Sequence, residues 1–357
     1  MPKRGNTRPN PLETIADRLP REAFAGERGE NLIGLPTLDD LQAAARTIDG
    51  RVHRTPMLSS HSLGTLVGRE VLLKAELFQR TGSFKLRGAT NRVAALTAAE
   101  RTAGAVTVSA GNHAQAAALA CAEQGVDLVV FMPRAASATK VAATRGYGAV
   151  VDLDSADGAE AFARMYAFAA ESGRVVLQPF DDPRVIAGQG TVGLEICADV
   201  SAPGAVLVPA SGGGLVAGVA LAVKALAPAS RVIAVQPRAT ATLAASRTPG
   251  HVQAAPARRP GAVTIADALT APAIGELCLR ACAEHVDEVV HLEEEEIREG
   301  MRFIYARAKL ACEPGAAVGV GALLAGKVSD LGAGPVVAVV SGGNVTPELA
   351  ASVLAPA

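Results

Sequence analysis

Two cations stand at the expected start of a helix, in the segment TGSFKLRGA of residues 81–89. The first three residues of this segment are typical of a helix start. Lys85 and Arg87 would then lie in the first turn, where the helix dipole disfavours a cation by about 0.3–1 kcal/mol. Two such violations within three residues favour a functional site. The alternative is that both cations are solvated side chains that the helix tolerates at small cost. A lysine amine near a helix amino end is also easier to deprotonate, so Lys85 is a candidate nucleophile for attack on an aldehyde.

Three adjacent glycines follow a second strand, in the segment VLVPASGGGLVAG of residues 206–218. They let successive backbone N–H groups converge on a phosphate at a helix start. A nucleoside triphosphate site would need Lys and then Ser or Thr after the glycines, where Leu215 stands instead. A dinucleotide site would need an acid about 20 residues on, where the next strand ends in Gln236. The segment therefore predicts a phosphate cradle without nucleotide features, with a tight contact between helix and sheet as the alternative.

A third turn, SAGNH at residues 109–113, joins a strand to an Ala-rich helix. Ala110 and Gly111 leave the backbone N–H groups bare, so this turn could hold a small carboxylate against the helix dipole. Asn112 offers a neutral donor and acceptor beside it, with an ordinary N-cap role as the alternative. His113 has the side chain of a base, but capping or packing explains it better.

A fourth turn, SGGN at residues 341–344, contributes Ser341, whose hydroxyl offers one weak hydrogen bond at the end of a strand. Together the four turns supply an amine nucleophile, a phosphate cradle, a carboxylate socket and a hydroxyl. This set matches a pyridoxal phosphate enzyme that acts on an amino acid. The alternative is a protein without cofactor that binds an amino acid and does not turn it over.

The composition limits the class of partner. The chain has 357 residues, of which 49% are hydrophobic and 19% charged, so it can fill one large core or two modest ones. A formal net charge of -1 gives no electrostatic attraction to nucleic acid or to an acidic membrane surface, so a small-molecule partner is expected. No stretch approaches the ~18 apolar residues of a membrane span. Residues 1–35 resemble neither a signal nor a transit peptide and predict a mobile arm.

The cysteines predict a reducing compartment. There are five, an odd number, which argues against a disulfide framework and for a cytoplasmic protein. Cys278, Cys282 and His285 have spacings that would place them along one helix face. Their neighbours are Leu and Ala, so the two thiols are expected to be small buried hydrophobes, and no metal site is predicted.

From about residue 36 onward, β-branched runs alternate with Ala-rich helical patterns. Strands are expected at residues 71–75, 105–109, 128–132, 149–153, 175–178, 205–209, 232–236, 288–291 and 336–340. Helices are expected, among others, at residues 37–48, 113–124, 156–171, 185–199, 215–226 and 293–309. The alternation predicts an α/β fold with mostly parallel sheet, whose ligands bind at the carboxyl ends of the strands. The Pro-rich stretch at 249–260 predicts a surface loop.

Several motifs occur in the order typical of serine/threonine dehydratases: SFKLRGA, SAGNHAQ, FMPRAASATKVAATRGYGA, QPFDDPRVIAGQGTVGLEI, SGGGLVAG, CEPGAAVG and SGGN. The chain resembles this family over about residues 37–355, and with it the tryptophan-synthase-β-like pyridoxal phosphate enzymes of fold type II. The resemblance implies two open, mostly parallel twisted sheets flanked by helices, and a homodimer. The implied division is a small domain at 101–179, inserted in a large cofactor-binding domain of 36–100 and 180–357. The regulatory C-terminal domain of biosynthetic threonine dehydratases is not expected.

The resemblance also implies roles for individual residues. Lys85 would form the Schiff base with pyridoxal phosphate and later carry the Cα proton, and Phe84 would pack on the cofactor ring. Asn112 would hydrogen-bond the phenolic oxygen of the ring, and Ser341 would face the pyridine nitrogen. Glu313 would be an acid near the pocket. The phosphate would bind Ser211, Gly212, Gly213, Gly214 and Leu215, and the substrate carboxylate would bind the backbone of Ser109, Ala110, Gly111, Asn112 and His113.

The implied reaction is the dehydration and deamination of a 3-hydroxy amino acid. Threonine would give 2-oxobutanoate and serine would give pyruvate, each with ammonia. A neutral Ser341 beside the nitrogen makes the ring a weaker electron sink, which favours loss of a β-leaving group over transamination. The resemblance implies that the cofactor phosphate protonates the departing hydroxyl.

Three departures from the family pattern leave alternatives open. Related racemases carry a serine where this chain has Ala110, so the acid on the opposite face that racemisation uses is lacking. Many relatives have an acid near Gln236 that binds a structural cation, so no metal is expected here. Residues 266–271 read ADALTA where relatives tend to read ADG. The substrate pocket is therefore open to a bulkier compound such as threo-3-hydroxyaspartate or phenylserine, and a β-replacement enzyme of the same fold also stays open.

Overall fold

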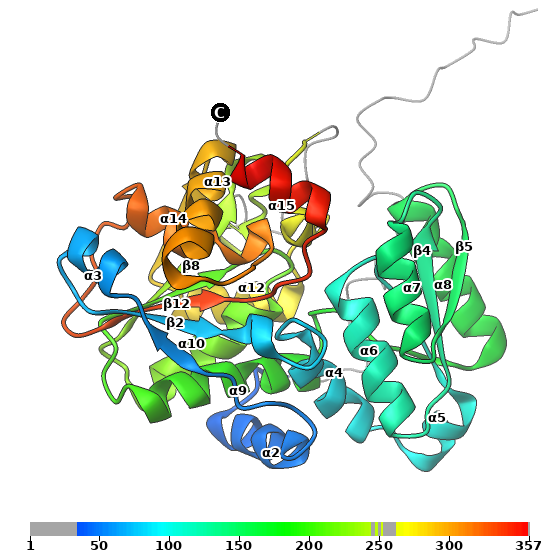
Figure 1. The fold of residues 1–357 in the computed structure, drawn as a ribbon. Helices are drawn as coiled ribbons and strands as arrows, with labels where there is room; N and C mark the ends of the chain where they lie inside the picture. Colours follow the sequence, from blue (N-terminus) through cyan, green and yellow to red (C-terminus); the bar gives the residue numbers. More distant parts are fainter. Residues whose placement is uncertain (1–33, 244–246, 249–250, 253–261, 356–357) are drawn as a thin grey trace, which may run out of the picture.

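Two open sheets of mostly parallel strands organise the chain, as the family resemblance implies (Figure 1). The computed structural model describes residues 34–243, 247–248, 251–252 and 262–355. The six-stranded sheet has the order β1-β2-β12-β7-β8-β11, in which β1 runs antiparallel to β2 and the other pairs are parallel. The four-stranded sheet has the order β5-β4-β3-β6 and is parallel throughout.

The strands of the larger sheet are β1 (Met57–Ser59), β2 (Val71–Ala75), β7 (Ala205–Pro209), β8 (Arg231–Pro237), β11 (Glu288–Leu292) and β12 (Val336–Val340). Those of the smaller sheet are β3 (Ala105–Val108), β4 (Leu128–Pro133), β5 (Val150–Ser155) and β6 (Val175–Val176). A short antiparallel pair, β9 (Arg247–Thr248) and β10 (His251–Val252), completes the strands of the described residues.

Helices cover both faces of the six-stranded sheet because its strands are apolar at successive positions. In β7, Val206 and Val208 pack on the face covered by α9 (Pro183–Asp199), α10 (Gly214–Leu226) and α12 (Glu276–His285). Ala205 and Leu207 pack on the other face, which is covered by α3 (His61–Val67), α13 (Glu294–Phe303), α14 (Val318–Leu324) and α15 (Pro347–Leu354). Successive residues of a strand point to opposite faces, so this continuous apolar run produces a sheet buried on both sides. Helix α2 (Leu38–Ile48) packs outside on α9.

Helix α4 (Lys85–Ala94) joins the two sheets (Figure 1). Its Leu86, Ala89 and Val93 enter the core between the four-stranded sheet and helices α6 (Asn112–Glu123) and α7 (Ala138–Gly146). On its other side α4 lies against α9, so close that a Cβ added at Gly188 would lie 2.6 Å from the Cα of Gly88. Helix α8 (Gly158–Ser172) covers the opposite face of the four-stranded sheet, and α5 (Ala98–Ala103) leads into β3. The division into domains at residues 36–100, 101–179 and 180–357 stays a prediction.

The sequence predicts most of these elements, and the strands at 71–75, 205–209 and 336–340 agree at both ends. The single helix expected at 293–309 is wrong, because α13 ends at Phe303 and continues as a π-helix, Ile304–Ala308. Ile304 and Leu310 are six positions apart, and in an α-helix such residues point about 120° away from each other. With the wider turn of the π-helix, both side chains are buried. Lys309 ends this turn in the left-handed region, with a φ of 60°.

Two further expectations fall on residues whose structure is not described. The arm predicted at residues 1–35 lies almost entirely outside the described residues, as does the loop predicted at 249–260 apart from the two residues of β10. Within the described part of the chain, no helix is both long enough and apolar enough to span a membrane.

Candidate active site

A cavity of about 590 Å³ opens between the two sheets, and it gathers the residues that the four turns contributed. Every site residue predicted from the sequence contributes to its wall: Phe84, Lys85, Ser109, Ala110, Gly111, Asn112, His113, Ser211, Gly212, Gly213, Gly214, Leu215, Glu313 and Ser341. Apart from Glu313, which precedes the short helix Pro314–Ala316, these residues follow β3, β7 and β12 or begin α4, so the cavity lies at the carboxyl ends of parallel strands. The structure brings these residues together around one cavity, and their roles as site residues stay predictions.

Lys85 is the first residue of α4 and borders the cavity. Its Nζ donates a hydrogen bond to the carbonyl of Pro179 (2.7 Å). Burial of the amine lowers the pKa of Lys85 to about 8, although nearby Cys278 and Glu313 act to raise it. The start of α4 is fixed from outside the helix, because the backbone N–H of Phe84 donates to the carbonyl of Ser341 (3.1 Å). An amine held in this way is partly neutral near pH 8 and can act as a nucleophile or a base.

The glycine loop, residues 211–215, leads into α10 and borders the same cavity. Gly213 is the N-cap and has a φ of 97°, a conformation that only glycine adopts readily. A Cβ at Gly212 would lie 2.4 Å from the Phe180 ring, and one at Gly213 would lie 2.6 Å from the Cβ of Cys278. Side chains are therefore excluded at Gly212 and Gly213. Helix α10 begins at the cavity wall, and its first N–H groups have no partner within the helix and carry positive partial charge.

The carboxylate loop, residues 109–113, ends in α6, whose N-cap is Gly111. The N-cap role considered for Asn112 is therefore wrong, because Asn112 is already the first residue of the helix. Its Nδ2 donates to both carboxylate oxygens of Glu313 (2.8 and 3.1 Å), and its Oδ1 accepts from the Nδ2 of Asn344 (2.7 Å). Asn344 also donates to the carbonyl of Thr81 (2.8 Å), so one amide joins three of the four turns.

His113 has the packing role that the sequence favoured. It is buried, and its Nε2 lies 3.0 Å from the hydroxyl of Thr107 and 3.3 Å from the carbonyl of Leu177. Burial, together with the nearby charge of Lys85, lowers the pKa of His113 to about 3. The imidazole is therefore neutral at physiological pH and is a poor proton acceptor.

Glu313 carries an unusual carboxyl. Burial, with a contribution from nearby Asp267, raises the pKa of Glu313 to about 7, although the hydrogen bond from Asn112 acts to lower it. A Cβ at Gly342 would lie 2.5 Å from the Oε1 of Glu313, so only glycine leaves room for this carboxyl. Glu313 is thus a carboxyl that keeps its proton up to a pH of about 7, and it is joined to the carboxylate loop by the hydrogen bonds from Asn112.

Replacing Glu313 with glutamine should stabilise the apoprotein increasingly as the pH rises. Below pH 4.5 the carboxyl is protonated in both the folded and the unfolded chain, so it contributes no pH dependence. Between pH 4.5 and about 7 the folded chain holds the extra proton, so wild-type stability falls as the pH rises. The advantage of Glu313→Gln should therefore grow by up to roughly 3 kcal/mol by pH 8, which urea unfolding at pH 5 and pH 8 would measure. An advantage that does not change with pH would contradict this.

Several residues of this region could not be found from the sequence. Phe180 packs beneath the glycine loop, and the next residue, Asp181, accepts hydrogen bonds from the N–H groups of Glu276 and Cys278 at the start of α12 (2.9 and 3.2 Å). These partners are more than 90 residues apart, so no local pattern connects them. Lys140 and Asp267 form an ion pair (2.5 Å) across the cavity wall, one from α7 beside the smaller sheet and the other beside the larger sheet.

The residues 266–271 also border the cavity, through Asp267, Ala268, Leu269, Thr270 and Ala271. The hydroxyl of Ser211 accepts from the backbone N–H of Ala271 (3.0 Å), which ties this segment to the glycine loop. Cys278 and Cys282 are buried in α12, as expected. Among the residues that the structure describes, no group of three or more His, Cys, Asp or Glu side chains is arranged to hold a metal ion.

Comparisons with known proteins identify one matching family model and several similar proteins. A family model described as pyridoxal-phosphate dependent enzyme matches residues 48–342. An L-threonine ammonia-lyase of Thermotoga maritima is 41% identical over 309 residues, which are 87% of this chain and 76% of the relative. The structure of maize serine racemase matches with a TM-score of 0.84 and 35% identity, over 88% of this chain and 95% of that one. The crystal structure of a threonine deaminase (T.th.) matches with a TM-score of 0.81 and 39% identity, over 87% and 99% of the two chains.

Proposed function

The chain belongs to the family of pyridoxal-phosphate-dependent enzymes, and from this premise we propose that it dehydrates and deaminates a 3-hydroxy amino acid. The proposed substrates are L-threonine and L-serine, which would give 2-oxobutanoate or pyruvate together with ammonia. The relatives named threonine ammonia-lyase and threonine deaminase support this assignment.

One observation carries the proposal: the Lys85 amine and the amino ends of α6 and α10 border the same cavity. The residues present fit pyridoxal phosphate. The glycine loop offers N–H groups without side chains to a phosphate, and the amine of Lys85 suits an aldehyde. Ser341, which borders the same cavity, suits a pyridine nitrogen that is not kept protonated. The carboxylate loop supplies a second anion site at a helix amino end, which suits the carboxylate of an amino acid.

Pyridoxal phosphate, when bound, supplies the electron sink for negative charge at the Cα of an amino acid. Lys85 would hold the cofactor and then take the Cα proton, because its pKa of about 8 leaves part of the amine neutral near physiological pH. The backbone of residues 109–113 would bind the substrate carboxylate and so orient the Cα. Glu313 and Asn344 would hold the Asn112 amide in one orientation through the hydrogen bonds at its two ends.

The decisive experiment is an assay of 2-oxo acid and ammonia release from a panel of 3-hydroxy amino acids. The panel includes threonine, serine, threo-3-hydroxyaspartate and phenylserine, because the segment 266–271 departs from the family pattern. Equal molar release of 2-oxo acid and ammonia from threonine or serine is expected. Release from one of the other two alone would move the proposal to a bulkier substrate. Product formation only after sulfide is added would indicate a β-replacement enzyme, and no release from any compound while cofactor absorbance persists would end the dehydratase proposal.

Racemisation is the second activity to measure, since the comparisons include serine racemases. Ala110 lacks an acidic hydrogen at the position where racemases carry a serine, so no side chain there can return a proton to the opposite face of the Cα. Loss of a proton donor typically costs about 10²–10⁴-fold, so D-serine should form at least about 100-fold more slowly than pyruvate. Chiral chromatography of the same reaction mixtures measures both rates, and comparable rates would contradict the interpretation of Ala110.

Removal of divalent cations should leave activity and thermal stability unchanged. The buried carboxamide of Gln236 has both ends satisfied by neutral backbone groups. It donates to the carbonyl of Ala210 (3.3 Å) and accepts from the N–H of Leu243 (3.2 Å). These bonds brace the strand end before the glycine loop without an ion. Activity that is lost on dialysis against a chelator and restored by magnesium or calcium would contradict this expectation.

A homodimer in the cytoplasm completes the proposal. The dimer follows from the family resemblance, and light scattering of the purified protein tests it. The five cysteines, all within the described residues, form no disulfide, which is typical of a reducing compartment.

A further inference from the structure

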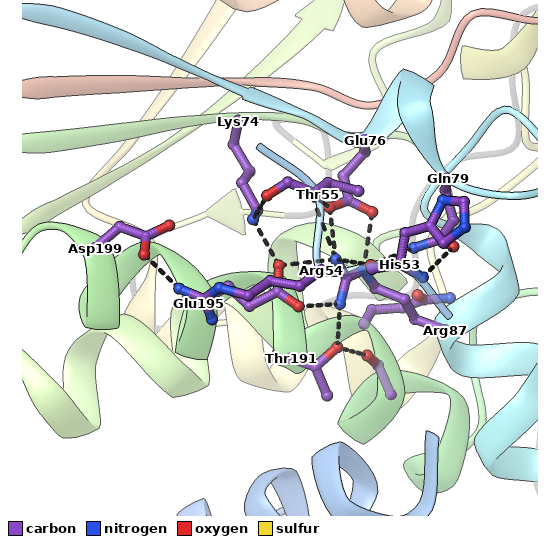
Figure 2. A network of polar contacts seen from close by, with 12 residues as sticks. His53, Arg54, Thr55, Lys74, Glu76, Gln79, Arg87, Thr191, Glu195 and Asp199 are labelled. Atoms are coloured by element: carbon purple, nitrogen blue, oxygen red, sulfur yellow. Dashed lines mark hydrogen bonds and ion pairs between the residues drawn. The ribbon is translucent and has the colours of Figure 1, made fainter. Parts of the chain in front are cut away.

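Four charged side chains are buried together behind the first turn of α4, on the side away from the cavity (Figure 2). Lys74, Glu76 and Arg87 have no exposed surface, and the side chain of Glu195 is 14% exposed. We call these four residues the charge cluster. It contains two cations and two carboxylates, so its formal charges cancel.

Arg87 is the centre of the charge cluster, held between two carboxylates. Its Nε and Nη2 donate to Glu76 (2.8 and 2.9 Å), and its Nη1 and Nη2 donate to Glu195 (2.7 and 2.9 Å). Lys74 Nζ donates to the second oxygen of Glu195 (2.5 Å). Both contacts of Arg87 are bidentate, the geometry in which a guanidinium has least freedom to rotate.

The cluster ties α4 to several elements of the larger sheet at once. Glu76 follows β2 in a short helix, Glu76–Phe78, and Glu195 lies on α9. Lys74, on β2, also donates to the carbonyl of Thr55 (2.7 Å), whose hydroxyl donates to Glu76 (2.5 Å). On α9, the hydroxyl of Thr191 accepts from Arg87 Nη1 (3.2 Å). Figure 2 shows Glu76, Thr191 and Glu195 converging on the one guanidinium, and Lys74 bonded to Glu195 beside it.

Stability alone does not account for the cluster. Burying four ionised groups carries a desolvation cost, and apolar residues of similar volume often replace buried ion pairs with no loss of stability. What apolar residues would not supply is a fixed direction, because bidentate hydrogen bonds set orientation as well as distance. The feature to explain is therefore why this turn of α4 needs a fixed direction.

Lys85 and Arg87 are two residues apart, which places their side chains about 200° apart around the helix. Lys85 accordingly borders the cavity while Arg87 points into the charge cluster. We propose that Arg87 is a positioning residue, which holds the first turn of α4 so that the Lys85 amine stays beside Pro179 at the cavity wall. This inference rests on the proposed role of Lys85 as the residue that holds the cofactor.

The test uses a charge-balanced double variant, Arg87→Met with Glu76→Gln. It removes the guanidinium and one carboxylate, so the ion pair of Lys74 with Glu195 remains and the site stays neutral. We expect it to fold, and its kcat to fall about 100-fold with little change in KM, the size of effect that a misplacement of about 1 Å produces. The single variant Arg87→Lys keeps the positive charge and loses the bidentate hydrogen bonds of the guanidinium. Its kcat is expected to fall less than that of the double variant.

Two readouts do not depend on turnover. The first is the rate at which the apoprotein captures pyridoxal phosphate as a function of pH. The midpoint should rise from about 8 toward 10.5 in the double variant, because the amine is no longer held in its buried position. Glu313 and Cys278, which act on Lys85 electrostatically, and His113, whose pKa Lys85 lowers, are unchanged in this variant. The second is hydrogen exchange, which should accelerate in the peptide covering residues 81–91 and not in α6.

Arg92→Met is the matched control on the same helix. Arg92 Nε donates to Asp182 (2.8 Å) in a partly exposed ion pair one turn after the charge cluster, so its loss should leave kcat and the pH midpoint unchanged. The proposal is overturned if the folded double variant keeps the wild-type kcat and pH midpoint, or if it is only less stable while its folded fraction works normally. If the double variant does not fold, Arg87→Lys decides by the same two criteria.

The failure of this inference is distinguishable from failure of the proposed function. If Lys85 does not hold the cofactor, Lys85→Ala will keep the visible absorbance of the bound cofactor. If only the role of Arg87 is wrong, Lys85→Ala will lose that absorbance while both Arg87 variants behave as the wild type.

Discussion

Lys85→Ala should lower 2-oxo acid release by at least about 10⁴-fold, because one side chain is expected to hold the cofactor and to move the Cα proton. The variant should still fold, since the Lys85 side chain borders the cavity and its amine donates to a single backbone carbonyl, that of Pro179. It should also fail to form a covalent bond to pyridoxal phosphate. Reduction with borohydride followed by peptide mass mapping measures this, and in the wild type it should label residue 85.

Lys224→Ala is the control for this experiment. Lys224 lies near the far end of α10 and pairs with Asp287 in a partly exposed ion pair, which typically contributes about 0–1 kcal/mol. Its loss should change neither labelling nor turnover. Borohydride labelling at a lysine other than 85, or turnover in Lys85→Ala within about tenfold of wild type, would remove the basis of the proposed mechanism.

Gly213→Ala should weaken the binding of pyridoxal phosphate by about 10- to 100-fold. A non-glycine residue at a φ of 97° costs about 1–2 kcal/mol, and the new methyl group would lie 2.6 Å from the Cβ of Cys278. Both effects displace the amino end of α10, where the phosphate is expected to bind. The measurement is titration of the apoprotein with pyridoxal phosphate and, separately, with pyridoxal, which lacks the phosphate.

The ratio of the two affinities isolates the phosphate contact. Wild-type protein should prefer the phosphorylated compound strongly, and Gly213→Ala should lose most of that preference while it binds pyridoxal about as well as before. Gly146→Ala is the control, because a Cβ at this exposed position of α7 meets nothing within 4 Å. An unchanged ratio in Gly213→Ala would mean that the glycine loop does not bind the phosphate.

The parts of the fold that could be predicted are those whose cause is local. The run 205–209 is apolar at every position, so a strand buried on both faces follows directly, and the structure has it with the same ends. The glycine and carboxylate loops could also be predicted, because a turn between a strand and a helix leaves its mark in consecutive residues. Strand β1 has only three residues, too few for an alternating pattern to be recognised.

The parts that could not be predicted depend on partners far apart in the chain. Asn112 is a plausible N-cap when its neighbours alone are considered, and its contact with Glu313 joins residues 201 positions apart. Arg87 stood out as a cation in the wrong part of a helix, but the reason lies 108 positions away in Glu195 and cannot be read locally. The pKa of Lys85 also has burial as its largest cause, and burial is a property of the folded chain.

The contact of α4 with α9 bears on how this protein can diversify. At Gly88 and Gly188 the two backbones touch, and a single added methyl group at Gly188 would overlap the neighbouring helix. Substitutions at this crossing are therefore strongly disfavoured, whereas Ala268, Thr270 and Ala271 border the cavity and are exposed or only partly buried. New substrate preferences should therefore arise by replacement of these three cavity residues, while the contact of α4 with α9 stays unchanged in natural variants and laboratory libraries alike.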